Sequence, residues 1–185
     1  MTKKKNYALT ITLCALFSAL IAVGAFIKIP IPIIPFTLQT LFVTLAGMLL
    51  GKKLGSISVL VYIVIGLIGI PVFTKGGGIS YVLQPTFGYI LGFVLSAFLT
   101  GLIIHKVSNP SYARIFVGGL TGLLAVYAVG VPYFYLISTY FLGNVIAAKV
   151  LLFNCFLMTL PGDIFFLILA TILSHRLIPL TKKYI

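Results

Sequence analysis

Residues 151–172 read LLFNCFLMTLPGDIFFLILATI, and this apolar run contains Asp163, the only acidic residue among 185. A carboxylate at membrane depth costs about 2.5–3.5 kcal/mol on insertion scales, so such a residue normally faces a polar cavity, a partner or a ligand. Pro161 and Gly162 are expected to break any incoming helix, and a new apolar helix then starts at Asp163. A carboxylate at a helix start can cap free backbone N–H groups or accept a hydrogen bond from a ligand. Asp163 is therefore the first candidate binding residue, with a pure helix cap as the alternative.

The composition is typical of an integral membrane protein. Apolar residues make up 61% of the chain and charged residues 8%, far from the averages of soluble globular domains. A spanning helix needs about 20 mostly apolar residues. The fold class predicted for residues 1–185 is therefore a single all-α transmembrane domain with six transmembrane helices. The net charge of +12 does not indicate nucleic-acid binding, because the basic residues lie singly or in small clusters between apolar runs.

Proline and glycine positions divide the chain into its predicted spans. Three prolines within residues 28–35 exclude a helix there, Gly51 to Gly55 predict a tight polar turn, and a helix is expected to end at 130–132. A secretory signal peptide at the start is disfavoured, because the first apolar run exceeds the about 7–15 residues of a signal core. The spans are expected at 8–27, 36–50, 56–70, 85–104, 115–129 and 164–178, with a short helix within 144–159.

The basic residues predict the orientation. If the chain crosses six times, ten of its thirteen Lys and Arg residues fall on one side, and basic loops mark the cytoplasmic side. Both termini are therefore expected in the cytoplasm, and the proline and glycine loops are expected outside. The cytoplasmic set is Lys3, Lys4, Lys5, Lys52, Lys53, Lys106, Arg114, Arg176, Lys182 and Lys183; the outer set is Lys28, Lys75 and Lys149.

Polar residues from separate parts of the chain are expected to meet at the outer face. Irregular backbone at membrane depth persists only where it lines a cavity or is buried in protein, which predicts an outward-facing pocket. Its candidate residues come from the second span, the glycine loop, the start of the fourth span, the short helix and the start of the sixth span. They are Asp163, Gln84, Tyr81, Tyr89, Thr37, Gln39, Thr86, Gly88, Lys149 and Asn154.

Five motifs, in this order, carry a family resemblance over nearly the whole chain. They are Ala15-x-x-x-Ala19, Pro35-Phe36-Thr37-Leu38-Gln39-Thr40, Gly76-Gly77 through Tyr81, Pro85-Thr86-Phe87-Gly88-Tyr89 and Pro161-Gly162-Asp163. Together they resemble BioY, the biotin-specific S component of energy-coupling factor (ECF) transporters. The resemblance implies a six-helix substrate-binding protein that takes biotin from outside.

The resemblance also implies partners and shows two departures. Ala15 and Ala19 would dock onto a transmembrane coupling subunit that carries two ATPases, although small residues at this spacing also suit packing inside the chain. Family members often have Gly at position 87 and Lys at position 166, where this chain has Phe. Either Lys149 or Lys75 then takes the place of that lysine beside Asp163, or the acid relies on helix-start N–H groups and ligand donors.

The function expected is that of a substrate-binding transport subunit in the bacterial plasma membrane, crossing the lipid bilayer several times. The chain has no Gly-x-x-x-x-Gly-Lys-Ser/Thr motif and no acidic metal ligands, so any ATP use lies in partners, and no catalytic residue, metal or cofactor is predicted. Biotin would place its ureido N–H groups at Asp163 or Gln84 and its carboxylate at Lys149, Lys75 or a helix N-terminus. The alternatives are a facilitator that works alone and, less favoured, an intramembrane enzyme with Asp163 as acid or base.

Overall fold

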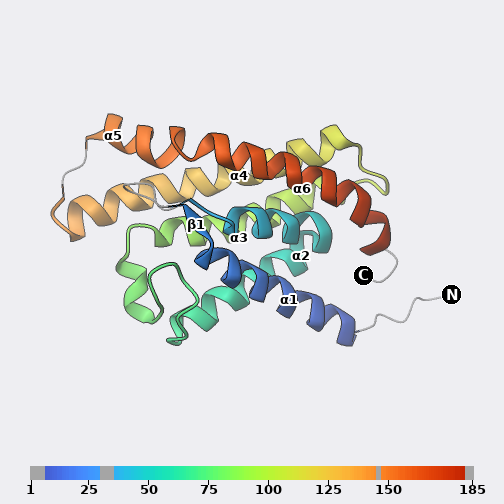
Figure 1. The fold of residues 1–185 in the computed structure, drawn as a ribbon, viewed down its shortest axis with the longest axis horizontal. Coiled ribbons are helices and arrows are strands. Elements are labelled where there is room, and N and C mark those ends of the chain that lie inside the picture. The colour runs from blue at the N-terminus through green and yellow to red at the C-terminus, as the bar shows by residue number, and fades with distance from the viewer. Residues whose placement is uncertain (1–6, 30–35, 145–146, 182–185) are drawn as a thin grey trace.

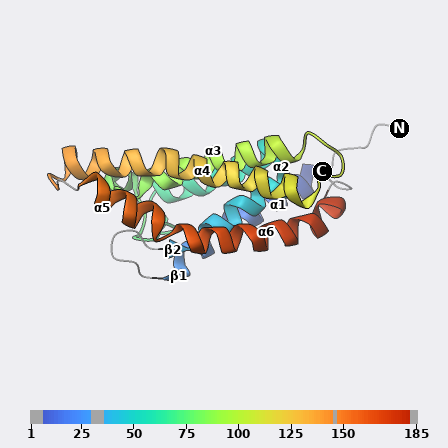
Figure 2. The same cartoon turned by 90° about the horizontal axis from the view of Figure 1, so that it is seen from above.

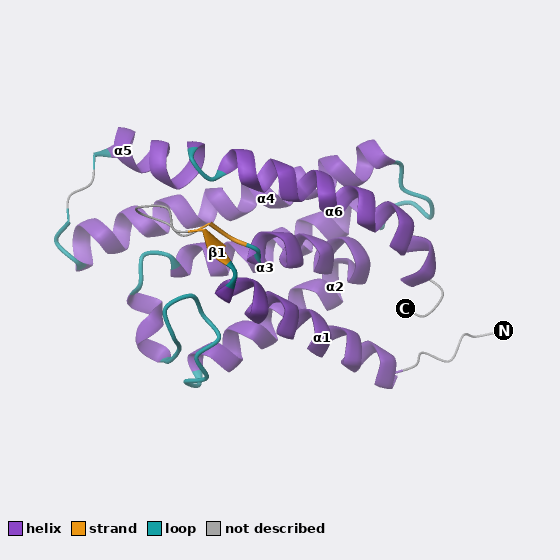
Figure 3. Cartoon of the chain, viewed as in Figure 1, coloured by secondary structure: helices purple, strands orange, loops and turns teal. Residues whose placement is uncertain are grey.

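The computed structural model describes residues 7–29, 36–144 and 147–181. Long helices lie side by side and make up most of the molecule (Figures 1 and 3). The helices are α1 (Tyr7–Phe26), α2 (Gln39–Leu67), the 3-10 helix η1 (Ile79–Leu83), α3 (Phe87–Ile104), α4 (Tyr112–Leu136), the π-helical turn η2 (Ile137–Phe141), α5 (Ala148–Leu152), the π-helical turn η3 (Phe153–Leu157) and α6 (Leu160–Thr181). Two short strands, β1 (Lys28–Ile29) and β2 (Phe36–Thr37), pair antiparallel.

The helices confirm an all-α membrane protein. Five helical stretches within the described residues are long and apolar enough to cross a membrane. This differs from the predicted six, because the second and third predicted spans both belong to α2. The five stretches are Tyr7–Phe26, Gln39–Leu67, Phe87–Ile104, Tyr112–Phe141 and Lys149–Thr181.

The helix α2 folds back on itself at Gly51. This residue has φ 78° and ψ −180°, a backbone conformation that glycine adopts at low cost. In a straight helix, Gln39 and Tyr62 would lie about 34 Å apart, yet the side-chain amide of Gln39 donates to the Tyr62 hydroxyl at 2.7 Å. The arms 39–50 and 52–67 therefore lie against each other (Figure 1). The turn predicted at Gly51 to Gly55 is correct in position. It is shorter than predicted, because Gly51 is the single residue of α2 with a non-helical backbone conformation.

One predicted helix break is wrong, and a second lies a few residues earlier than predicted. The helix α4 continues through Pro132 to Leu136 and on into the π-helical turn η2. Pro161 lies in the first turn of α6, where its missing N–H costs little. The helical path before it is relaxed by η3, where the N–H of Met158 donates to the carbonyl of Phe153 at 3.0 Å, five residues back. Membrane helices accept proline where such local adjustments satisfy the freed backbone groups. The short helix expected within 144–159 corresponds to α5 and η3.

Small residues allow α3 and α4 to pack closely. A Cβ added to Gly122 would overlap the hydroxyls of Ser96 and Thr100 on α3. The Thr100 hydroxyl also donates to the carbonyl of Gly118 at 3.2 Å. The close approach of α3 and α4 therefore depends on glycine at position 122.

Several basic segments gather at one end of the bundle. His105 Nε2 lies 2.9 Å from the carbonyl oxygen of Met48, next to the Gly51 turn, and Arg114 Nε donates to the carbonyl of Ile103 at 2.9 Å. The rings of Tyr112 and His175 stack at 3.7 Å. The start of α1 and the end of α6 lie at this end too, whereas β1, β2 and η1 lie away from it (Figures 1 and 2). Lysines 3, 4, 5, 182 and 183 and the prolines 30, 32 and 35 are outside the described residues.

The helix α1 turns its alanine pair outward. Ala15 and Ala19 are both exposed, whereas Phe17, Ser18 and Ile21 are buried against the rest of the chain. The Ser18 hydroxyl donates to the carbonyl of Ser58 at 2.7 Å and fixes this rotation of the helix. The alternative that Ala15 and Ala19 pack inside this chain is therefore wrong.

Candidate functional site

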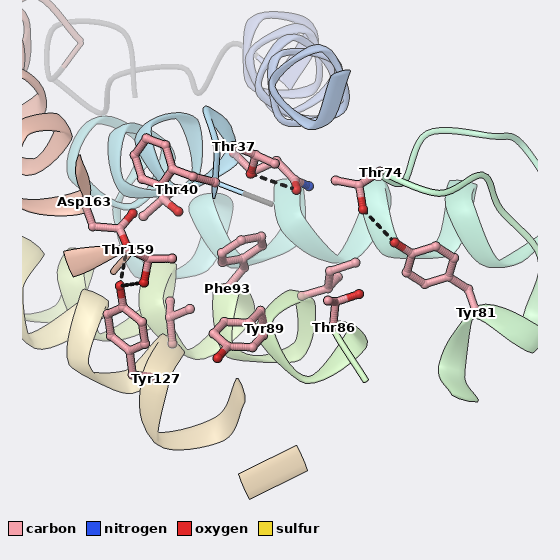
Figure 4. Close-up of a pocket in the computed structure, with 14 residues that line it drawn as sticks. Thr37, Thr40, Thr74, Tyr81, Thr86, Tyr89, Phe93, Tyr127, Thr159 and Asp163 are labelled. Carbon is pink, nitrogen blue, oxygen red and sulfur yellow. Dashed lines mark hydrogen bonds between the residues drawn. The ribbon is translucent and has the colours of Figure 1, made fainter. Parts of the chain in front are cut away.

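A cavity lies among β2, α2, α3, α4, α6 and the loop before η1. A concave site lined by apolar side chains with a few polar groups is typical of small-molecule pockets. Figure 4 shows its polar side chains approaching from several elements. The lining residues are Phe36, Thr37, Gln39, Thr40, Thr74, Tyr81, Thr86, Tyr89, Ile90, Phe93, Val126, Tyr127, Thr159 and Asp163.

Asp163 forms the charged part of the cavity wall. It is 6% exposed and lies in the first turn of α6. The Tyr127 hydroxyl donates a short hydrogen bond to its Oδ2. The Tyr127 oxygen also lies 2.8 Å from the Thr159 hydroxyl, which donates to the carbonyl of Phe156 at 3.2 Å. Tyr127 and Thr159 thus form a polar relay that fixes one carboxylate oxygen.

The other oxygen of this carboxylate has no such partner. Oδ1 of Asp163 and Oγ1 of Thr86 are buried polar atoms without a hydrogen-bond partner among the described residues. Thr40 faces the same carboxyl group from α2 (Figure 4). A buried acceptor without a donor costs about 1–3 kcal/mol, so both atoms are suited to a ligand that brings its own polar groups.

The N–H of Asp163 does not need a cap. It donates to the carbonyl of Thr159 at 3.0 Å, which continues the helical pattern of the preceding turn. The carboxylate lies at a helix start as predicted, but its hydrogen bond comes from a side chain of α4. Among the described side chains, neither Lys149 nor Lys75 pairs with it; Tyr127 of α4 and Thr40 of α2 meet the carboxyl group instead.

A second polar relay supports the wall formed by β2 and α2. Thr37 Oγ1 donates to Gln39 Oε1 at 3.3 Å, and the Gln39 amide donates to the Tyr62 hydroxyl. That hydroxyl donates to the carbonyl of Val72 at 3.3 Å, in the loop after α2. Gln39 thereby finds the partners that a buried amide needs, and it ties the loop to the helix.

Aromatic rings form the apolar part of the wall. The Tyr89 hydroxyl donates to the carbonyl of Cys155 at 3.1 Å, which leaves its ring beside Phe93 in the cavity (Figure 4). Tyr81 shares a hydrogen bond of 2.9 Å with the hydroxyl of Thr74. Between these groups the wall is formed by Ile90 and Val126. The cavity therefore combines an apolar middle with polar groups at separate places on its rim.

Phe36 explains the residues on either side of Asp163. A Cβ added to Gly162 would collide with the Phe36 ring, so glycine is needed for this close approach. Phe166 stacks on the same ring with centroids 5.1 Å apart. Position 166 therefore supplies an aromatic support where family members often have a lysine. Within the part of the chain that the structure describes, the lining has no Lys, Arg or His.

Six of the ten predicted site residues line the cavity. Gln84 lies at the end of η1 and Gly88 in the first turn of α3, and neither forms part of the lining; Gly88 packs against the ring of Tyr133. Lys149 and Asn154 lie along a separate shallow surface of α5 and η3, where the Asn154 amide donates to the carbonyl of Val150 at 2.9 Å. The structure does not bring these four residues to the cavity wall. The six that it brings together are Asp163, Tyr81, Tyr89, Thr37, Gln39 and Thr86.

Several lining residues were not predicted from the sequence. Tyr127 has the clearest role, and a tyrosine in the middle of an apolar span, away from the membrane boundary, is the signal that indicates it. Thr40 and Thr159 carry no distinctive pattern. The remaining lining residues that were not predicted are Phe36, Thr74, Ile90, Phe93 and Val126.

Comparisons with known proteins agree with this architecture. The family model described as BioY matches residues 1–183. The probable biotin transporter BioY of Lysinibacillus sphaericus is 47% identical over 94% of this chain and 89% of its own length. The biotin transporter BioY of Thermotoga maritima is 45% identical over 63% of this chain and 68% of its own. The crystal structure at 2.1 Å of the S component for biotin from an ECF-type ABC transporter superposes with a TM-score of 0.81 at 31% identity, covering 96% of this chain and 94% of that one. With a family match over almost its full length and relatives this similar, the chain belongs to the BioY family.

Proposed function

We propose that this chain is the biotin-specific S component of an ECF-type transporter and that the cavity beside Asp163 is its biotin site. The observation that carries the proposal is the buried Oδ1 of Asp163, an acceptor without a partner among the described residues. The family match and the likeness to an S component for biotin support it. The protein is a multi-pass membrane transport protein rather than an enzyme.

Biotin has the groups that this cavity requires. Its ureido ring presents N–H donors, which suit the free Oδ1 of Asp163 while Tyr127 holds Oδ2. The fused rings and the aliphatic chain suit the apolar wall beside Tyr89 and Phe93. A hydrogen bond to a charged group is worth about 1.5–3 kcal/mol, so this one contact contributes a large share of the specificity for a donor-bearing ring.

The distribution of basic residues supports a cavity that opens to the outside. The loops near Gly51, His105 and Arg114 lie together with the ends of α1 and α6, and basic loops mark the cytoplasmic side. If each arm of α2 counts as one crossing, the chain crosses six times with both termini in the cytoplasm. The loop carrying Lys75 then faces outward.

Cysteine labelling tests this orientation. In a background without Cys14 and Cys155, a cysteine at Lys75 should react with an impermeant thiol reagent added outside intact cells. A cysteine at Lys52 should react only after the membrane is opened, because it lies at the Gly51 turn on the opposite side. The reverse pattern of labelling would place the cavity on the cytoplasmic side and contradict the proposed uptake.

Reconstitution tests the need for partners. The chain has no nucleotide-binding motif, so proteoliposomes that contain it alone should bind biotin without accumulating it. Addition of a transmembrane coupling subunit, two ATPase subunits and ATP should start accumulation. Accumulation driven by the chain alone would instead favour the stand-alone facilitator.

A further inference from the structure

The cavity provides no cation for the acidic group of its proposed ligand. Biotin carries a carboxylate at the end of its aliphatic chain, and a carboxylate without a partner at a low-dielectric site is costly. Among the described residues, the lining includes one carboxylate and no Lys, Arg or His. A countercharge from a described side chain would therefore come from the rim.

Lys28 lies at that rim. It is exposed in β1, where its Cα pairs with that of Thr37 across the two-stranded sheet. Its Nζ donates to the carbonyl oxygen of Thr74 at 3.4 Å. Both Thr37 and Thr74 line the cavity, so the backbone of Lys28 adjoins one part of the wall and its ammonium contacts another. An ammonium has three donors, and the contact with Thr74 uses one of them.

The Lys28 ammonium has no acidic side chain of this protein as an ion-pair partner. Asp163 is the single Asp or Glu in the sequence, and it accepts its hydrogen bond from Tyr127 inside the bundle. The other two outer lysines are placed differently. Lys149 lies on the surface of α5, away from the cavity lining, and Lys75 is exposed next to Thr74 in the chain. Of these three outer lysines, Lys28 is the one that donates a hydrogen bond to a cavity-lining residue within the described part of the chain.

We propose that Lys28 binds the carboxylate of the ligand at the rim of the cavity, an assignment that rests on the proposed biotin site. Figure 4 shows Asp163 and the pair Thr74 and Tyr81 on opposite sides of the drawn lining, with Phe93 and Tyr89 between them. This order of polar, apolar and polar groups corresponds to a ligand with N–H donors at one end and an acid at the other. Asp163 binds the ureido ring of the ligand, and Lys28 binds its carboxylate.

The test compares biotin with biotinamide, which keeps the ureido ring and lacks the negative charge. In purified protein, Lys28→Met should weaken biotin binding about three- to tenfold, as for a partly solvated charged hydrogen bond. Biotinamide binding should stay unchanged in the same variant. Lys28→Arg should retain most of the affinity for biotin, and the matched control Lys75→Met should bind both ligands as the unmodified chain does.

Each other outcome has a separate meaning. Equal weakening of both ligands in Lys28→Met would show a structural role for Lys28 and overturn the assignment, and so would unchanged biotin binding. A loss of biotin affinity confined to Lys75→Met would move the carboxylate site to Lys75. Failure of the unmodified chain to bind biotin would contradict the proposed function itself, which separates that failure from a failure at Lys28.

Discussion

Asp163→Asn should weaken biotin binding on the order of ten- to a hundredfold while the protein stays folded. The substitution keeps the shape and one carbonyl acceptor but removes the charge, and a charge-assisted hydrogen bond is worth about 1.5–3 kcal/mol. Tyr127 can adapt, because its hydroxyl can accept from an asparagine amide and donate to Thr159 instead. The loss should therefore appear in the dissociation constant for biotin rather than in the melting temperature.

A buried threonine of the same helix provides the control. Thr171 lies in α6 outside the cavity lining, and its hydroxyl donates to the carbonyl of Leu167 at 2.7 Å. Thr171→Val should leave the dissociation constant unchanged. If well-folded Asp163→Asn also binds biotin with unchanged affinity, then Asp163 is a structural partner of Tyr127 and not a ligand-binding group.

The double substitution Ala15→Trp and Ala19→Trp should abolish ATP-driven biotin uptake and leave biotin binding by the isolated chain almost unchanged. Both alanines are exposed on α1, on the face turned away from the buried Phe17, Ser18 and Ile21, so tryptophan there adds bulk outside the core of this chain. A helix of another subunit can approach this face closely only while its residues are small. Transport by the complete complex and copurification of the coupling subunit measure the effect.

A matched pair on α6 controls for the added bulk. Ile168 and Ile172 have the same spacing of four residues and are 46% and 44% exposed. Tryptophan at both positions should leave complex assembly intact. Weak biotin binding by the purified alanine variant, together with a lower melting temperature, would instead show that Ala15 and Ala19 stabilise the isolated chain.

Apolar length and glycine position were sufficient to predict the bundle, whereas the helix breaks were not. The chain reverses at Gly51 as its sequence predicts, because a positive φ favours glycine there. Pro132 was expected to end a helix, but α4 continues through it to Leu136. The break expected at Pro161 lies just before α6, which starts at Leu160 after the π-helical turn η3. Short-range sequence patterns do not encode such π-helical turns.

The site shows the same division between local and tertiary information. Asp163 was predicted because a lone acid in an apolar run is costly wherever it lies. Its partner Tyr127 is 36 residues away on α4, and only the packing of α4 against α6 brings the two together. Lys149 was predicted from its charge and its outer position, but its position on α5 places it on a different surface. Residue type was enough to predict a polar binding group. Which residues line the cavity depends on how each helix is rotated against its neighbours, and the sequence pattern does not show that.

Equilibrium titration of the purified chain with biotin, in the absence of any coupling or ATPase subunit, is the most direct test of the proposed site. A preformed cavity containing a buried acceptor predicts saturable binding of one biotin per chain, with the affinity lowered in Asp163→Asn and retained in Thr171→Val. Absence of biotin binding by the folded chain, or an affinity that is the same in Asp163→Asn as in the unmodified chain, would contradict the assignment of this cavity as the biotin site.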